Sequence, residues 1–204
     1  MRMLLLVVSA YLLAVLPAFA WKDINSGSSV TRYIGKNIGE VQFTLSTPLN
    51  EQENSVDRIK VLKNGKEVQW MEVQYDTPPS DQCELLHFED LNFDGYQDVL
   101  VLTGWGPEGN SYDVWIYNKN LIAFEKSPLL SPLRNYTLDK NRKEIRSGSS
   151  DNGAAEGSTS FFKVVKGKVE LYKEVSRETG KDGKVKTTTK VKSKKGWKTV
   201  PESA

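Results

Sequence analysis

The chain has very little of the chemistry that disulfide-linked proteins and metalloenzymes use. Among its 204 residues there is one cysteine, Cys83, and one histidine, His87. A single cysteine forms no disulfide within the chain, so stability must come from the core, the size of the domain or a metal. A structural zinc site takes about four Cys or His ligands. We therefore expect both residues to be structural.

Catalytic motifs are scarce as well. The sequence has no glycine-rich phosphate loop, no zinc motif and no Ser-x-Gly nucleophile turn near His87. Its 26 acidic residues could supply carboxylate pairs, but no spacing marks one pair for glycoside chemistry. We expect no enzymatic activity.

Long apolar runs are missing except at the N-terminus. Residues 1–20, MRMLLLVVSAYLLAVLPAFA, carry Arg2, then no charge, and end in the small-x-small pattern AFA. This combination is typical of a secretory signal peptide, with an uncleaved membrane anchor as the alternative. No later segment is long and apolar enough to span a bilayer. We expect export to the periplasm and a single mature domain over residues 21–204.

Charge is unevenly distributed along the mature chain. Residues 21–162 hold 14 Lys and Arg against 21 Asp and Glu, a net charge of −7. Residues 163–204 hold 13 against 5, a net charge of +8. This basic end suits an acidic partner, or it is simply a set of solvated strand lysines. No nucleic-acid partner is expected.

Strand patterns dominate, and no amphipathic helix exceeds one or two turns. Residues 39–47, GEVQFTLST, alternate apolar and polar side chains as a half-buried strand does. Tight hairpin turns are expected at residues 64–65, 166–167 and 195–196. The sequence predicts an all-β fold of consecutive antiparallel hairpins, closed as a propeller-like array, a sandwich or a barrel.

An acidic nonapeptide, DLNFDGYQD at residues 90–98, lies between two apolar runs. Counted from Asp90 as place 1, oxygen-bearing side chains occupy places 1, 3, 5 and 9, a spacing that turns successive oxygens toward one point. Gly95 at place 6 permits the sharp bend after place 5. Hard oxygen ligands without nitrogen or sulfur favour calcium, and magnesium is less suited. The predicted ligands are Asp90, Asn92, Asp94, Tyr96 through its carbonyl, and Asp98.

This loop differs from an EF-hand in two ways. Place 12 is Val101 instead of a bidentate glutamate, and both flanks have strand patterns. We expect a structural calcium ion that fixes the loop between two core strands. The alternative is an Asp- and Gly-rich turn that binds nothing.

Two segments are candidates for partner binding. Trp105 lies in TGWGPEGNSYD, where glycine and proline would display a large ring, or where the ring closes the end of the core. The small polar run 147–158, SGSSDNGAAEGS, is expected to be an exposed loop. Its residues Ser147, Gly148 and Ser149 could enter a cleft, or the run could be a plain hairpin tip.

The segment FEDLNFDGYQDVLVLTGWG, with YDVWIYN, the Ser-Gly run and a tail containing KVELYKEV and KGWKTV, resembles a family of calcium-containing periplasmic lysozyme inhibitors. This family includes immunity proteins against secreted peptidoglycan hydrolases. The likeness begins near residue 84 and covers most of the mature chain. It implies a β-propeller-like fold, calcium on the predicted ligands, and inhibition by occluding a muramidase cleft.

The resemblance also bears on the partner surface. Other lysozyme-inhibitor families insert a Ser-Gly loop between the catalytic carboxylates of the enzyme, and Ser147-Gly148-Ser149 is similar to it. The aromatic residue often found just downstream is absent here.

Two functions follow. The first is a periplasmic, calcium-binding inhibitor of a lysozyme-like peptidoglycan hydrolase, in the manner of an immunity protein. The alternative is a calcium-dependent module that binds envelope glycan or protein without inhibition, through Trp105 and the basic hairpins.

Overall fold

The computed structural model describes residues 21–23, 29–48, 58–73, 85–106, 109–151 and 156–200. The expected signal peptide and Cys83 lie outside these residues. The described part is built from β-strands and contains no α-helix, which confirms the all-β prediction. It likewise holds no helix with the length and apolar character that a membrane span requires.

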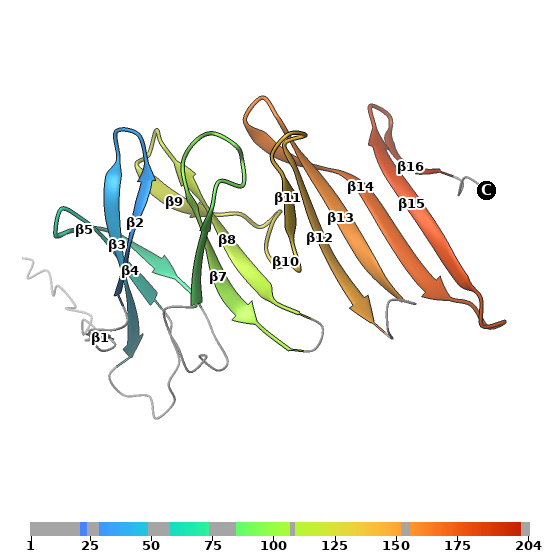
Figure 1. Ribbon diagram of the computed structural model, residues 1–204, viewed down its shortest axis with the longest axis horizontal. Helices are drawn as coiled ribbons and strands as arrows, with labels where there is room; N and C mark the ends of the chain where they lie inside the picture. The colour runs from blue at the N-terminus through green and yellow to red at the C-terminus, as the bar shows by residue number, and fades with distance from the viewer. Residues whose placement is uncertain are drawn as a thin grey trace, which may run out of the picture.

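The strands form three antiparallel sheets that follow one another along the chain (Figure 1). Sheet A contains β1 (Trp21–Asp23), β2 (Ser29–Gly35), β3 (Gly39–Pro48), β4 (Arg58–Lys63) and β5 (Lys66–Glu72). Sheet B contains β6 (Leu86–Glu89), β7 (Asp98–Gly104), β8 (Ser111–Asn118), β9 (Ala123–Lys126) and β10 (Leu133–Arg134). Sheet C contains β11 (Thr137–Asp139), β12 (Glu144–Asp151), β13 (Glu156–Val165), β14 (Lys168–Thr179), β15 (Val185–Ser193) and β16 (Gly196–Val200). The sheets lie in a row and do not close into a barrel.

Local sequence explains the hairpins. Asn64 and Gly65 have φ angles of 52° and 73°, and Lys166 and Gly167 have 52° and 75°. Two successive positive φ angles define the two-residue turn whose twist matches that of the flanking strands. The predicted turns therefore lie where β4 meets β5 and where β13 meets β14.

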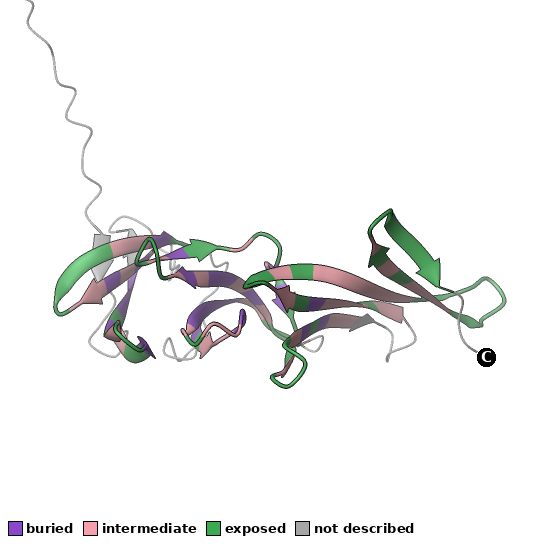
Figure 2. Cartoon of the chain, turned by 90° about the horizontal axis from the view of Figure 1, so that it is seen from above, coloured by how far each residue is buried: buried purple, intermediate pink, exposed green. Residues whose placement is uncertain are grey.

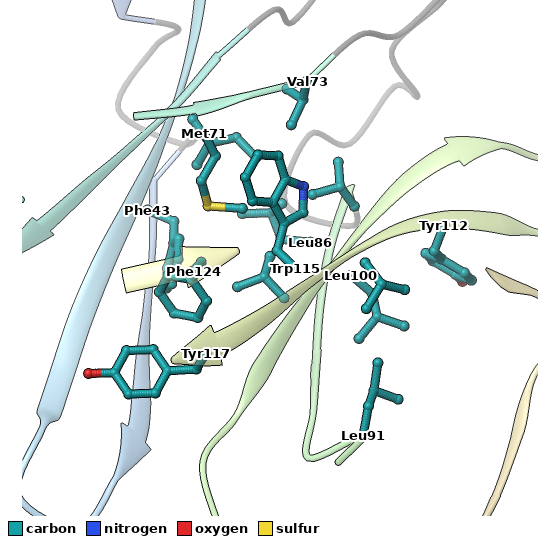
Figure 3. Packing of buried hydrophobic residues seen from close by; sticks show 14 of the residues in the cluster. Phe43, Met71, Val73, Leu86, Leu91, Leu100, Tyr112, Trp115, Tyr117 and Phe124 are labelled. Atoms are coloured by element: carbon teal, nitrogen blue, oxygen red, sulfur yellow. The ribbon is translucent and has the colours of Figure 1, made fainter. Parts of the chain in front are cut away.

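An aromatic cluster joins sheets A and B (Figure 3). The ring of Phe43 on β3 is fully buried, 5.1 Å from the Phe88 ring and 5.5 Å from the Phe124 ring. Tyr117 on β8 continues the cluster, 5.1 Å from Phe124. Tilted and edge-on ring contacts of this kind add to the stabilisation that comes from burying apolar area.

A side-chain amide also links the two sheets at their edges. Gln69 on β5 donates from Nε2 to the Phe124 carbonyl at 2.7 Å and accepts from the Phe124 N–H at 2.8 Å. The amide thus satisfies both main-chain groups of one β9 residue, as a neighbouring strand would.

Sheet C becomes thinner with distance from the core. Ile145 on β12 and Phe162 on β13 are buried, but no side chain of β14, β15 or β16 is. Every residue of β16 is exposed. Figure 2 shows this outer part extending beyond the core as a single layer.

Replacing Phe43 with Ala should destabilise the fold by about 3–5 kcal/mol, because it removes a fully buried ring and leaves a cavity between sheets A and B. Urea unfolding followed by tryptophan fluorescence measures this loss. Val68→Ala on β5 is the control, since the Val68 side chain is exposed. Equal effects of the two substitutions would contradict a core centred on Phe43.

Candidate functional site

The acidic loop connects β6 to β7, and Asp98 anchors it. The Asp98 side chain is fully buried. Its Oδ2 accepts from the Leu91 N–H at 2.9 Å, and its Oδ1 accepts from the Tyr117 N–H at 2.8 Å. One carboxylate therefore ties the start of the loop to the neighbouring strand β8.

The oxygens at the first places of the loop converge. Oδ1 of Asp90 and Oδ1 of Asn92 both accept from the Asp94 N–H, at 3.0 and 3.1 Å. Oδ2 of Asp90 accepts from the Gly95 N–H at 2.9 Å, and Asp94 Oδ1 accepts from the Tyr96 N–H at 3.1 Å. Gly95 has a φ of 88°, the left-handed conformation that the sharp bend requires.

The electrostatics of the loop favour a positive partner. The pKa of Asp98 is raised to about 7, chiefly by burial and to a lesser degree by the charges of Asp94 and Asp90. The hydrogen bonds from the Tyr117 and Leu91 N–H groups act in the opposite direction. A cation among these carboxylates would offset their mutual repulsion.

The ligand atoms of the loop are oxygens, which calcium prefers, but their side chains are arranged to bind main-chain N–H groups. Within the described ranges, no group of three or more His, Cys, Asp and Glu side chains is placed to hold a metal ion. A physical reason is that both Asp98 oxygens are directed at main-chain N–H groups. Calcium also accepts amide and carbonyl oxygens, such as those of Asn92 and Tyr96, and each carboxylate oxygen has a second lone pair. The ligand assignment therefore stays a prediction.

Sheet A holds the other side of the loop. The Gln97 N–H donates to the Ile34 carbonyl at 2.7 Å. A Cβ atom on Gly35 would lie 2.6 Å from Cδ1 of Tyr96, so this position requires glycine. The Tyr96 ring is 5.4 Å from that of Tyr117. The roles of Gly35 and Tyr117 could not be predicted from the sequence, because nothing near them in the chain indicates that a distant loop packs against them.

The predicted partner-binding residues differ in exposure, and the Ser-Gly run is not the exposed loop that the sequence predicted. Ser147 is buried; its hydroxyl accepts from the Arg134 N–H at 2.8 Å and donates to the Arg134 carbonyl at 3.0 Å. Gly148 and Ser149 are half-buried on β12. Trp105, directly after β7, is 48% exposed. The structure brings Trp105 and Ser149 together as lining residues of one cavity.

The expected exposed loop over residues 147–158 is therefore wrong for most of its length. Residues 147–151 belong to β12 and residues 156–158 to β13, paired as Ser147 with Ser160 and Ser149 with Ser158. Small side chains fit there because Ser147 packs beneath β10. Residues 152–155 lie outside the described part.

Changing Asp98 to Asn should destabilise the protein by about 1–3 kcal/mol in the presence of chelator, because one amide oxygen cannot accept from both buried N–H groups. Urea unfolding at pH 8.5, above the pKa of Asp98, measures the loss without calcium. Asp182→Asn is the matched control, since Asp182 caps an exposed turn by accepting from the Lys184 N–H. If both variants unfold at the same urea concentration, Asp98 is not the anchor of the loop.

Comparison with known proteins gives a likeness in fold. No protein-family model matches the chain, and no curated protein matches its sequence. Among solved structures, the fold is similar to that of a Xanthomonas type IV secretion system related protein. The TM-score is 0.57 at 16% sequence identity, covering 90% of this chain and 98% of the other. At this identity the likeness establishes a shared all-β architecture.

Proposed function

We propose that this chain is an extracytoplasmic, secretion-associated protein that inhibits a lysozyme-like peptidoglycan hydrolase, as immunity proteins do. The observation that carries the proposal is the fold similarity, over nearly the whole of both chains, to a protein related to a type IV secretion system. The signal-like residues 1–20 support an address outside the cytoplasm, with the periplasm as the expected compartment.

The outer part of sheet C supplies the approach surface for such an enzyme. Residues 168–200, which are strands β14–β16 with their connecting turns, hold 11 Lys and Arg against 4 Asp and Glu, a net charge of +7 on a layer without buried side chains. A hydrolase that cleaves glycosidic bonds presents carboxylates in its cleft. Complementary charge speeds the encounter more than it strengthens the final complex.

Calcium is the second part of the proposal. The ion would be held by Asp90, Asn92, Asp94, the Tyr96 carbonyl and Asp98, and it would neutralise the charge gathered between β6 and β7. Its role would be structural, because the loop is fixed on one side by Ile34 and on the other by Tyr117.

Calcium should raise the thermal midpoint of the wild-type chain and leave that of Asp94→Ala unchanged. A ligand at 100 times its Kd stabilises the folded state by about 2.7 kcal/mol. Differential scanning fluorimetry with calcium, magnesium and chelator measures the shift.

Asp139→Ala is the matched control for calcium, since Asp139 likewise accepts main-chain N–H groups, from Asn141 and Arg142, but lies outside the loop. It should keep the full calcium shift. Identical wild-type melting with calcium and with chelator would show that the loop is an empty turn.

The mature chain should protect purified peptidoglycan from at least one muramidase of a panel that includes any hydrolase encoded beside it. Loss of turbidity with time measures lysis. Calcium should strengthen protection by wild type and by Asp139→Ala but not by Asp94→Ala. Undiminished lysis by every enzyme, with calcium present, would refute the inhibitor proposal.

A further inference from the structure

Two neighbouring cavities form a groove where sheets B and C meet. The first has a volume of about 320 Å³ and is lined by Trp105, Arg134 and Ser149, among others. The second has a volume of about 310 Å³ and is lined by Arg146 and Arg177, and it shares Ser149 with the first. Ligand sites of small molecules range over about 300–1,000 Å³, so each cavity suits a unit the size of a sugar ring.

The lining of the groove is positively charged. Among the residues that the structure describes, the two cavities are lined by Arg134, Arg146 and Arg177 and by no Asp or Glu. Among the side chains that the structure describes, no carboxylate forms an ion pair with Arg134 or Arg146. The Arg146 guanidinium lies 5.6 Å from the centroid of the Phe161 ring, a contact that leaves its N–H groups available to a ligand. Guanidinium groups bind carboxylates through paired N–H donors, so the groove favours an anion with planar oxygens.

The first cavity adds an aromatic surface to this charge. The exposed Trp105 ring lines a wall whose other members include Gly104, Gly106 and Gly109. An indole offers a flat apolar face with one polar edge, which matches the C–H face of a pyranose. Glycines let a ligand approach the main chain. The side-chain amide of Asn110 donates from Nδ2 to the Tyr112 hydroxyl at 3.2 Å, and its oxygen and second N–H suit hydroxyl and acetamido groups.

The groove is built in advance of any ligand. Asn135 donates from its N–H to the Asn110 carbonyl and accepts at Oδ1 from the Asn110 N–H, both at 3.1 Å. Gly109 has a φ of 97°, and a Cβ atom there would lie 1.8 Å from Asn135 Oδ1. Ser147 fixes the main chain of Arg134 through its two hydrogen bonds. A wall held in this way loses little conformational freedom on binding.

We propose that this groove binds a carboxylated amino-sugar oligosaccharide, with one ring against Trp105 and the carboxylate of an adjoining unit on Arg146. The carboxylate can come from the lactyl ether of a muramic acid or from a uronic acid. The site goes beyond the inhibition of a hydrolase and does not depend on it.

Isothermal titration of the mature chain with three tetrasaccharides tests the proposal. They are a peptide-free glycan of alternating N-acetylglucosamine and N-acetylmuramic acid, a hyaluronan fragment, and neutral chitotetraose. At least one acidic glycan should bind tenfold or more tightly than chitotetraose. Comparing the two acidic glycans shows which source of the carboxylate the groove accepts.

Variants assign the binding to the groove. Trp105→Ala should weaken every glycan that binds tenfold or more, and Arg146→Gln should remove the advantage of the acidic glycans while leaving chitotetraose unchanged. Trp197→Ala is the matched control, because Trp197 is 43% exposed and lies on β16, away from the cavities. All of these side chains are exposed, and unchanged urea midpoints would confirm that the variants fold.

Three results would overturn the proposal: no binding of either acidic glycan, equal binding of acidic and neutral glycans, or equal losses in Trp105→Ala and Trp197→Ala. If Trp105→Ala removes hydrolase inhibition while no glycan binds, the groove is a protein contact instead. If glycans bind while every muramidase stays active, the groove stands and the inhibitor proposal falls.

Discussion

The buried carboxylate of Asp98 is the constraint on which the loop between β6 and β7 depends. It accepts from Leu91 at one end of the loop and from Tyr117 on β8, so a single side chain sets the path of three consecutive elements. Removing a charged group from water is costly, and the two N–H donors offset only part of that cost. The buried Asp98 carboxylate therefore both orders the loop and adds to the repulsion among its carboxylates. For this reason we propose a cation at this site.

The molecule divides into a thick part and a thin part. Sheets A and B share an aromatic core around Phe43, whereas the outer strands of sheet C bury no side chain. Hydrophobic burial therefore stabilises the first two sheets. Of the outer strands, β14 packs the partly buried Val169 and Leu171 against the core, while β15 and β16 rely on tight turns and the hydrogen-bond ladder. The lysines of this thin part consequently face no carboxylates from a second layer. The basic C-terminal part of the sequence therefore forms a basic end of the molecule.

The groove lies at the boundary of these two parts. Trp105 follows β7, Arg134 lies on β10 and Arg146 lies on β12, and Ser147 holds β10 against β12. A small buried hydroxyl at this junction lets two sheets approach closely and opens polar cavities beside it. The proposed calcium loop and the proposed glycan groove are thus separate sites, one where sheets A and B meet and one where sheets B and C meet.

Much of the local structure could be predicted from the sequence. Alternating side chains and turns such as Asn64-Gly65 and Lys166-Gly167 act over a few residues, so the all-β class and these hairpins follow directly. The acidic loop was also recognisable, because its oxygens and Gly95 lie within nine positions. Tertiary structure decided three other features: the strands within residues 147–158, the packing of Tyr96 against Gly35, and the shared cavity of Trp105 and Ser149. Tyr96 and Trp105 meet residues far away in the chain. The strands at 147–151 and 156–158 pair with each other as a hairpin, which is supported by β14 alongside β13 and by the hydrogen bonds of Ser147 to Arg134.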